Sequence, residues 1–399
     1  MRLLFVADGR SPTALSWIRH WIETGHETHL VSTFPCDPPP GLASFHLLGV
    51  AFSRFARRRG NSSVDTLGPG GAVQRWSGIL RRARYVLGPM SLPAYRKRFH
   101  QIAKELHPDL IHALRIPFEG MLAEAAPEGI PVVVSTWGND LTLHASGSIL
   151  MSRLTRRTLQ RANGLISDTA RDIRLACDWG FAKGKPTIII PGAGGIRLDE
   201  IKAVSPATIL PEVFADVPIV VNPRGQRPGS LRQDVFFQSI PMVLEKIPQA
   251  VFICLQLAGD RESERWVDVL GIRANTRLWN MLNREQVLAL FKLARVYVSP
   301  SIHDGTPNSM LEAMACGSFP VVGNVDSLRE WITPGVNGLL VDATSAKELA
   351  NGIVTALENR DLYEKGRNKN ALIIAERADH RQCMAMTEAF YRDVVGINS

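Results

Sequence analysis

The sequence predicts an α/β protein built from two doubly wound domains, each with a parallel sheet covered by helices on both faces. Short apolar, β-branched runs alternate with longer amphipathic segments along the whole chain. No hairpin signal joins consecutive runs, and strand–helix alternation of this kind is typical of parallel sheets. The strand–helix alternation occurs twice, before and after a segment in which Pro206, Pro211 and Pro218 interrupt the apolar periodicity. The 399 residues suffice for two domains of about 100–200 residues each.

The first half supplies six expected strands and five expected helices. Each strand is a short apolar run that a two-sided sheet would bury, and each helix has apolar residues spaced to cover a sheet. The strands are expected at 2–7, 28–33, 110–113, 132–136, 164–167 and 187–190. The helices are expected at 13–24, 95–106, 118–126, 148–161 and 169–179.

The second half repeats the pattern and ends in a long helical stretch. Its strands are expected at 219–221, 251–255, 277–279, 296–299, 320–322 and 338–341. Its helices are expected at 233–246, 264–270, 284–294, 309–316, 327–332 and 345–358, and the segment 360–395 reads as helix throughout. We place the N-terminal domain at 1–202, completed by 379–399, and the C-terminal domain at 203–378. Parallel sheets bind ligands at the carboxyl ends of their strands, so a cleft between the two domains is expected to hold the chemistry.

Composition and charge exclude several classes of protein. The mean hydropathy is close to zero, and no apolar stretch approaches the roughly 20 residues that span a bilayer. The five cysteines are scattered, which argues against a disulfide framework and a structural zinc site. The first eight residues read as a strand and not as a signal peptide. We therefore expect a cytoplasmic protein.

The net charge of +8 is concentrated in the first half, above all between Arg54 and Arg98. Aromatic and aliphatic residues interleave with the arginines there, which favours an anionic surface such as a lipid leaflet, and hence a peripheral position at the inner face of a membrane. The alternative is that the arginines form ordinary solvated helix faces. No zinc-finger, RNP or basic-zipper signature accompanies them, so nucleic acid is not an expected partner.

The strongest chemical signal lies between a strand that ends at Ser299 and a helix that begins near Asn308 and stops at Gly317. The N–H groups and positive dipole end at the start of such a helix form a site for a diphosphate. Asp304 precedes this helix, and Glu312 lies about one turn inside it. Carboxylates there would repel phosphate, so their natural partners are sugar hydroxyls, which donate hydrogen bonds to them. This arrangement predicts a nucleotide-sugar site.

These residues also carry a resemblance to a known family. Asp304 is followed by seven residues and then by Glu-Ala-Met-Ala-Cys-Gly at 312–317 and Pro-Val-Val at 320–322, with further similar segments at 329–332 and 335–340. The pattern resembles that of family-4 glycosyltransferases of the GT-B fold, which usually have Glu where this chain has Asp304. The resemblance implies two Rossmann-like domains facing across a cleft, with the last helix returning to the first domain. It further implies transfer of a sugar from a nucleotide diphosphate sugar to an acceptor hydroxyl with retained configuration, with no cofactor and no required metal.

The resemblance also implies roles in the donor site. Glu312 would bind the ribose hydroxyls, and Asp304 would contact the transferred sugar. The expected donor-binding residues are completed by the start of the helix, whose backbone would meet the diphosphate: Gly305, Thr306, Asn308 and Ser309.

Cations are needed because cleavage leaves extra negative charge on the nucleoside diphosphate. The family places an Arg just after the first strand of the second domain, where this chain has Arg224, and a Lys a few residues later, where it has none. We expect Arg232 to substitute for that Lys, with Arg227 as the next candidate. Arg224, Arg232 and Asp304 are therefore the expected catalytic residues.

The N-terminal domain is expected to hold the acceptor, a glycan or a lipid-linked molecule used in cell-surface polysaccharide or glycolipid assembly. The candidates are the loop after the first strand and the ends of two later strands: Gly9, Arg10, Ser11, His112, Trp137, Asn139 and Asp140. His112 is alternatively a buried, structural histidine.

Three other functions would leave different signatures. A nucleotide-sugar epimerase of similar architecture would show an additional acid pair for proton exchange. A dehydrogenase would need a G-x-G-x-x-G motif after a first strand, which neither half has. A non-catalytic anionic-surface-binding protein would use the basic first half and would not need Asp304, Glu312 and Arg224 together.

Overall fold

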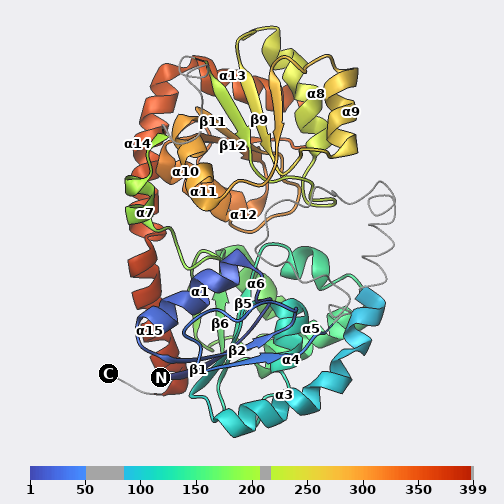
Figure 1. Cartoon of the computed structure of the whole chain (residues 1–399), viewed down its shortest axis with the longest axis vertical. Coiled ribbons are helices and arrows are strands. Elements are labelled where there is room, and N and C mark those ends of the chain that lie inside the picture. Colours follow the sequence, from blue (N-terminus) through green and yellow to red (C-terminus); the bar gives the residue numbers. More distant parts are fainter. Residues whose placement is uncertain (51–84, 207–216, 397–399) are drawn as a thin grey trace. The chain divides into compact units, whose positions relative to one another are not determined.

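The computed structural model describes residues 1–50, 85–206 and 217–396. The chain divides into two compact units: unit 1 comprises Met1–Gly195 and Arg381–Ser399, and unit 2 comprises Ile196–His380 (Figure 1). The boundaries expected from the sequence were 202/203 and 378/379, whereas the two units divide at 195/196 and 380/381. Each unit contains one fully parallel sheet with helices on its faces, which confirms the predicted fold class.

The sheet of unit 1 has the strand order β3-β2-β1-β4-β5-β6-β7. Its strands are β1 (Arg2–Ala7), β2 (Glu27–Ser32), β3 (Ser44–Leu47), β4 (Leu110–Ala113), β5 (Val132–Thr136), β6 (Gly164–Ser167) and β7 (Thr187–Ile189). The helical elements are α1 (Pro12–Glu23), α3 (Leu92–Leu106), η2 (Ile116–Gly120), α4 (Met121–Ala123), η3 (Asp140–His144), α5 (Ile149–Arg161), α6 (Ala170–Asp178) and α15 (His380–Val395).

Alternate residues of the central strands feed two apolar layers. In β1, Leu4 and Val6 face one layer, and Leu3 and Phe5 face the other. The second layer includes Tyr391 of α15, which stacks on Trp21 of α1 with ring centroids 4.8 Å apart. The last helix therefore packs on unit 1, as the resemblance implied.

The sheet of unit 2 has the order β10-β9-β8-β11-β12-β13. Its strands are β8 (Ile219–Asn222), β9 (Val251–Leu255), β10 (Thr276–Trp279), β11 (Val296–Ser299), β12 (Phe319–Gly323) and β13 (Leu339–Val341). Its helices are α7 (Leu198–Ala203), α8 (Gln233–Leu244), α9 (Arg261–Val269), α10 (Arg284–Leu293), α11 (Asn308–Cys316), α12 (Asp326–Arg329), α13 (Ala346–Glu358) and α14 (Arg360–Arg377).

The segment expected as one helix over 360–395 is divided into α14 and α15. The backbone of Ile196 donates to the carbonyl of Ala378 (2.6 Å) and accepts from the N–H of His380 (3.0 Å). These bonds occupy backbone groups that a continuous helix would pair internally, so the helix is interrupted where Ile196 runs alongside it. The expectation of one unbroken helix was therefore wrong at this point.

Both sheets reverse their strand order at one place. The reversal lies between β1 and β4 in unit 1 and between β8 and β11 in unit 2. Loops leaving the carboxyl ends of the two strands at such a switch point diverge to opposite faces, which opens a crevice where ligands of doubly wound sheets bind. Ligand-binding residues are therefore expected in the loops that follow β1 and β4 in unit 1, and β8 and β11 in unit 2.

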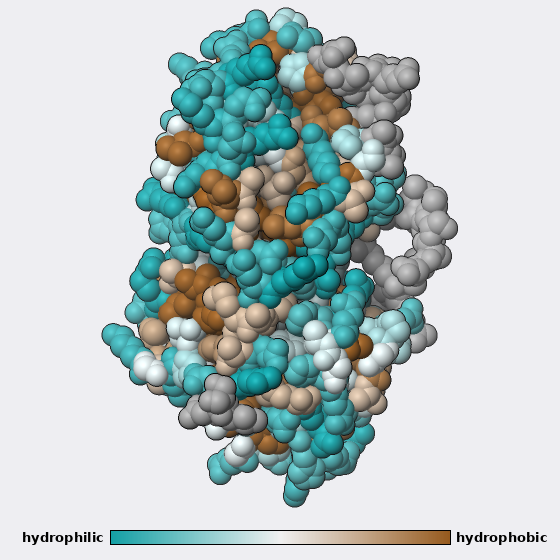
Figure 2. Space-filling view, turned by 90° about the vertical axis from the view of Figure 1, so that its left-hand side faces the viewer, coloured by the Kyte–Doolittle hydropathy of each residue, from teal (hydrophilic) through white to brown (hydrophobic). Residues whose placement is uncertain are grey.

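The surface is largely polar on the face shown in Figure 2, with apolar residues gathered in separate patches. Scattered apolar side chains are normal on a folded protein. Within the described part of the chain, no helix combines the length and apolar character needed to cross a bilayer. The arginines at 54, 57–59, 75, 81–82 and 84, on which much of the predicted basic surface depends, lie outside the described residues.

Candidate active site

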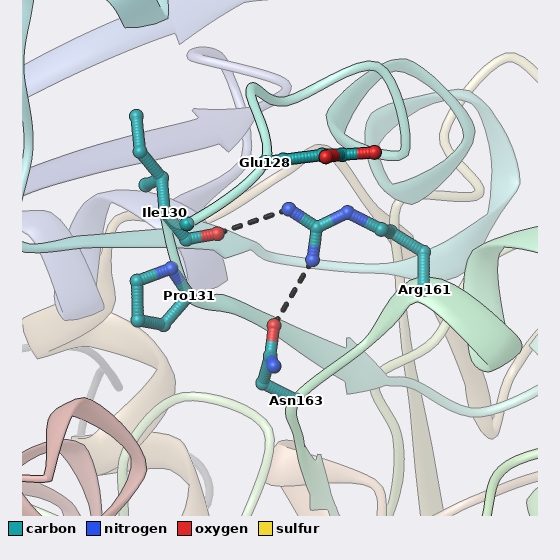
Figure 3. Close-up of a pocket in the computed structure, with 6 residues that line it drawn as sticks. Glu128, Ile130, Pro131, Arg161 and Asn163 are labelled. Carbon is teal, nitrogen blue, oxygen red and sulfur yellow. Dashed lines mark hydrogen bonds between the residues drawn. The ribbon is translucent and has the colours of Figure 1, made fainter.

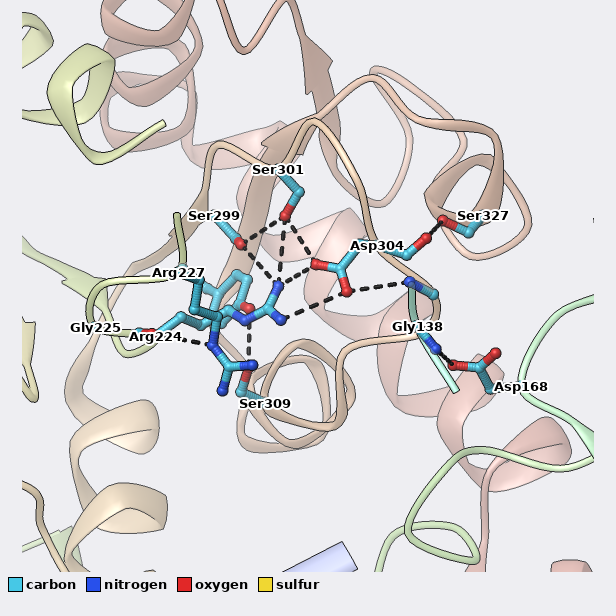
Figure 4. Close-up of polar contacts among 12 residues, drawn as sticks. Gly138, Asp168, Arg224, Gly225, Arg227, Ser299, Ser301, Asp304, Ser309 and Ser327 are labelled. Carbon is cyan, nitrogen blue, oxygen red and sulfur yellow. Dashed lines mark hydrogen bonds and ion pairs between the residues drawn. The ribbon is translucent and has the colours of Figure 1, made fainter. Parts of the chain in front are cut away.

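Arg224 and Asp304 meet at the switch point of unit 2 (Figure 4). Arg224 follows β8 and Asp304 follows β11, and their side chains form an ion pair in which they are only 10% and 9% exposed. The Asp304 carboxylate also accepts from the hydroxyl of Ser301 (2.9 Å) and from the N–H of Gly305 (3.1 Å). Two residues 80 positions apart are thus held together where the fold predicts a ligand.

Backbone contacts fix the two loops that carry this pair. Ile302 donates its N–H to the carbonyl of Ser230 (2.8 Å), and Arg232 donates to the carbonyl of Pro300 (3.0 Å). Gly323 in β12 allows close packing, because a Cβ there would lie 1.9 Å from the carbonyl oxygen of Ser301. The loops after β8 and β11 are therefore a preformed structure.

The charges at this point act on each other. Burial alone would lower the pKa of Arg224, but the adjacent Asp304 carboxylate outweighs it, so the pKa is raised and the guanidinium stays charged. Arg227 lies beside Arg224 and donates from Nε to the Arg224 carbonyl (3.2 Å). Burial and the neighbouring Arg224 lower the pKa of Arg227.

Arg232 does not join this group. Its guanidinium pairs with Asp234 (Nη2 to Oδ2, 2.7 Å), the neighbour two residues along the chain, and its side chain is 35% exposed. Of the two arginines that the sequence offered as a second cation, Arg227 lies beside Arg224, whereas Arg232 pairs with Asp234. The loop after β8 is held to the loop after β11 by backbone contacts of Leu231 with Ser301 and of Arg232 with Pro300, which sets the positions of these two arginines.

Helix α11 runs from Asn308 to Cys316 and is capped by Gly317, whose φ of 97° is the left-handed conformation expected of a terminating glycine. Pro307 precedes the helix and supplies no side-chain capping bond. The Trp331 indole donates to the Thr306 hydroxyl (2.9 Å), and the Tyr297 and Ser309 hydroxyls are 3.0 Å apart. These contacts hold the start of α11 next to Arg224 and Asp304.

Glu312 lies on α11 with its side chain 14% exposed, and it pairs with Arg284 at the start of α10. Arg284 also donates from Nε to Glu200 Oε2 of α7 (2.8 Å). Burial raises the pKa of Glu312, and Arg284 opposes that rise. The sequence did not single out Arg284, because no motif distinguishes it from other arginines at helix starts.

The loop after β1 in unit 1 is also tightly held. The Arg10 guanidinium binds the Asp8 carboxylate in a bidentate manner, from Nε to Oδ1 (3.0 Å) and from Nη2 to Oδ2 (2.9 Å). The N–H of Gly9 donates to the Ser32 hydroxyl (3.1 Å). A Cβ at Gly9 would lie 2.4 Å from the Cys36 sulfur, so a larger residue there would require the Cys36 side chain to shift. Ser11 caps α1 by accepting from the N–H of Ala14 (3.4 Å).

His112 is buried inside unit 1. One ring nitrogen contacts the Tyr391 hydroxyl and the other the Ser135 hydroxyl (2.8 Å). Burial lowers the pKa of His112 to about 3, so the imidazole is neutral at physiological pH. These contacts support the structural reading of His112 and give no support to the site role that the sequence left open.

Asp140 is fully buried and connects two loops. It accepts from Arg115 Nη2 (2.6 Å) and from the N–H groups of Ile116 and Trp137 (both 3.2 Å). Asn139 precedes η3 at the same turn, and Trp137 is partly buried against the second apolar layer. Asp140 therefore positions the loops after β4 and β5, which place Trp137 and Asn139 at the carboxyl edge of the sheet.

Arg115 and Glu119 follow β4 at the switch point of unit 1, and the sequence reading missed both. Glu119 is 4% exposed and accepts from the Thr33 hydroxyl (2.6 Å). Burial raises the pKa of Glu119 from 4.5 to about 7, with Arg115 opposing and Asp8 reinforcing the rise. The adjacent Phe118 has a φ of 69°, rare for a residue with a side chain. The sequence had assigned 118–126 to an ordinary helix, so Glu119 was read as a helix residue, and no motif marked Arg115.

We expect Glu119→Gln to change the pH dependence of stability. Between pH 4.5 and 7 the folded state keeps the Glu119 proton that the unfolded chain releases, so this group makes the folded protein less stable as pH rises. His112 has the opposite effect on stability below pH 6.5. Its pKa is lowered in the folded state, so the unfolded chain binds the proton more readily and the folded protein gains stability as pH rises towards 6.5. The difference in melting temperature, Glu119→Gln minus wild type, should therefore rise from pH 4.5 to 7 and then level off, corresponding to a free energy on the order of 1–3 kcal/mol. A flat difference curve would refute the raised pKa.

A shallow pocket lies at the opposite, amino edge of the unit 1 sheet (Figure 3). Arg161 donates there to the carbonyls of Pro127 (3.2 Å) and Ile130 (3.0 Å) and to the Asn163 side chain (3.0 Å). Its guanidinium thus serves to hold the ends of β5 and β6. Because ligands of such sheets bind at the carboxyl edge, this pocket is not the candidate site.

Comparisons with known proteins agree with this geometry. A family model described as "Glycosyl transferase 4-like domain" matches residues 8–192, and one described as "Glycosyl transferases group 1" matches residues 232–371. The chain is a family-4-type glycosyltransferase of the GT-B fold. The first match lies within unit 1 of this glycosyltransferase and the second lies within unit 2. The match in unit 2 includes Asp304 and Glu312.

Individual relatives are distant. An N,N'-diacetylbacillosaminyl-diphospho-undecaprenol alpha-1,3-N-acetylgalactosaminyltransferase of Campylobacter jejuni is 29% identical over 127 residues, 32% of each chain. The alignments to such curated relatives span about a fifth to a third of their length. A sucrose-phosphate synthase structure from Thermosynechococcus elongatus matches with a TM-score of 0.72 at 16% identity over 100% of both chains. The structure of the Anabaena protein HepE in complex with UDP matches with a TM-score of 0.69 at 16% identity. The match covers 98% of this chain and 99% of that one.

Proposed function

We propose that this glycosyltransferase moves a sugar from a nucleotide diphosphate sugar to an acceptor hydroxyl with retained configuration. The observation that carries the proposal is the convergence of Arg224, Asp304 and the start of α11 at the switch point of unit 2. Glu312 follows about one turn into the same helix. Cations and helix N–H groups suit a diphosphate, and the two carboxylates suit the hydroxyls of ribose and sugar.

The chemistry we propose needs no protein nucleophile. The bond between the sugar carbon and the diphosphate oxygen breaks, the acceptor oxygen bonds to that carbon on the same face, and the acceptor proton passes to the departing phosphate. Arg224, Arg227 and the N–H groups at the start of α11 stabilise the charge that develops on the diphosphate. Asp304 holds Arg224 in place and accepts hydrogen bonds from the sugar. We propose that these groups suffice without a metal ion.

Arg227 and Arg232 provide a matched pair of variants. We expect Arg227→Ala to lower kcat by about tenfold or more, because its guanidinium lies next to Arg224, where it can share the diphosphate charge. Arg232→Ala should leave kcat within about twofold, because Arg232 is occupied by Asp234 at the surface. Steady-state kinetics with saturating acceptor decide between them, and the reverse order of effects would restore Arg232 as the second cation.

The experiment for the proposed function is proton NMR of the product formed from a UDP-sugar, with and without EDTA. UDP is the first nucleotide to test because the Anabaena neighbour was solved with it. An α-linked product from an α-linked donor, unaffected by EDTA, supports retention without metal. An inverted anomer or loss of turnover in EDTA contradicts those parts separately. Release of a free epimeric sugar without acceptor would favour the epimerase.

We propose that unit 1 receives the acceptor, a glycan or lipid-linked molecule of cell-surface polysaccharide or glycolipid assembly, at the cytoplasmic face of a membrane. The support is the set of polar side chains at the carboxyl edge of its sheet, among them Arg10, Arg115 and Asn139. The curated Campylobacter relative is named for an undecaprenol-linked acceptor, which makes a lipid-linked acceptor the first to test.

A further inference from the structure

Unit 1 carries a cluster of exposed apolar side chains beside the start of α5. We call this cluster the apolar edge, and its members are Val86, Leu87, Met90, Ile149 and Leu150, which are 52%, 46%, 64%, 90% and 36% exposed. Ile149, at the first position of α5, is the most exposed large apolar residue in the described part of the chain. Large apolar side chains gathered at one place on a surface usually mark an interaction site.

The two segments that form the apolar edge are held together by specific contacts. The Ser148 hydroxyl donates to the carbonyl of Tyr85 (2.7 Å), and the Tyr85 hydroxyl contacts a ring nitrogen of His144 (2.7 Å). Gly147 lies against the Tyr85 ring so closely that a Cβ would come within 2.6 Å of it. These contacts hold the chain before α3 beside the start of α5, so the exposed apolar residues that follow Tyr85 and Ser148 belong to neighbouring segments.

The two segments that carry these apolar side chains are rich in positive charge. Residues 85–106 and 144–161 together contain eight Lys and Arg but a single acidic residue, Glu105. Arg153 lies three and four positions after Leu150 and Ile149, so it shares their helix face. Lys97 and Arg98 are exposed on α3, whereas Arg96 and Arg157 pair with Glu124. Exposed cations next to exposed apolar side chains fit an anionic lipid surface, because the apolar groups enter the acyl boundary and the cations meet the headgroups.

Topology places the apolar edge near the expected acceptor residues. In a parallel sheet, the helix that follows a strand begins at the carboxyl edge, and α5 follows β5 and η3. Ile149 therefore lies at the same edge of the sheet as Trp137 and Asn139, and Figure 1 shows the start of α3 on the same side of unit 1 as α5.

We propose that the apolar edge inserts into an anionic lipid bilayer, with Lys97, Arg98 and Arg153 at the headgroups. Docking in this way brings the carboxyl edge of the unit 1 sheet to acceptors held in the membrane. The proposal relies on the proposed transfer function only for the presence of a membrane-borne acceptor, and lipid binding is measured without donor or acceptor.

The test is flotation of the full chain with vesicles of phosphatidylcholine alone or with 30% phosphatidylglycerol, in low and high salt. We expect binding to the anionic vesicles and weaker binding to the neutral ones, with a strong loss at 0.5 M salt because charges at the interface are screened. Met90→Ser/Ile149→Ser should reduce binding by about tenfold. Lys97→Glu/Arg153→Glu should reduce it similarly and flatten the salt dependence.

The chain offers matched controls in unit 2. Val269 and Leu372 are 70% and 57% exposed, so Val269→Ser/Leu372→Ser removes similar apolar surface elsewhere. Lys347→Glu/Lys369→Glu changes the net charge by the same amount at exposed positions. Both controls should bind like the wild type, and nucleotide affinity confirms that each variant is folded.

Several results would overturn the proposal. They are equal losses in the variants and their controls, no binding of the wild type to anionic vesicles, or a dimer in solution that Met90→Ser/Ile149→Ser dissociates. Failure of vesicle binding with nucleotide binding intact would leave the transfer function standing. Failure of nucleotide binding with vesicle binding intact would do the reverse.

Discussion

Replacing Arg224 by Ala is expected to lower kcat by about 10²–10³-fold, the cost typical of losing one preorganised group that stabilises developing charge. Arg224 is buried, charged and held at the switch point by Asp304. Because the diphosphate gains charge as the bond breaks, the interaction strengthens in the transition state. The donor KM should therefore change much less than kcat. Steady-state kinetics with varied donor measure both.

The control must separate chemistry from folding, since Arg224→Ala leaves Asp304 buried without its partner. The double variant Arg224→Ala/Asp304→Asn relieves that isolated charge and should recover melting temperature without recovering kcat. Arg224→Lys should retain part of the activity, because it keeps the charge but loses the planar fork. Equal losses in kcat and in donor affinity would reduce Arg224 to a binding residue.

Glu312→Gln is expected to weaken nucleoside diphosphate binding by about 10–100-fold. Hydrogen bonds from two ribose hydroxyls to a carboxylate are worth about 1.5–3 kcal/mol, and a neutral amide accepts them less strongly. The decisive comparison uses a 2′,3′-dideoxynucleoside diphosphate, which lacks both hydroxyls. Titration calorimetry should find that the variant and the wild type bind this analogue about equally.

Arg284 provides the control for Glu312, because Glu312→Gln also weakens the ion pair that links α11 to α10. Arg284→Gln breaks the same pair and leaves the carboxylate in place. If the two variants lose the same affinity, and lose it for the dideoxy analogue as well, the effect is structural and the ribose assignment is wrong.

Strand positions were predictable because each central strand is a short apolar run buried on both faces. β1, β4, β5, β6, β9 and β11 begin and end where the sequence placed them. The sequence did not predict β3 (Ser44–Leu47). It is an edge strand whose residues are partly exposed and include Ser44 and His46, so it contains no apolar run that would indicate a strand. The break between α14 and α15 was equally hidden, since it depends on backbone bonds from Ile196, far away in the sequence.

The sequence could indicate the residues of the proposed donor site only where a local pattern encodes their arrangement. Asp304 and Glu312 flank one helix start, so their spacing in the sequence fixes their relation to its N–H groups. Arg284 reaches Glu312 through the packing of α10 on α11, and Arg227 lies beside Arg224 because of the path of one loop. Glu119 gains its raised pKa from burial beside Thr33, which no local sequence pattern reveals.

The most direct test of the proposed donor site is calorimetric titration of the wild-type chain with UDP, GDP, ADP and CDP. With a diphosphate at the start of α11 beside Arg224 and a ribose at Glu312, at least one of the four should bind with micromolar affinity. Arg224→Ala and Glu312→Gln should each weaken that binding, Glu312→Gln the more strongly. If none of the four nucleotides binds, or if both variants bind as tightly as the wild type, the proposed donor site is wrong.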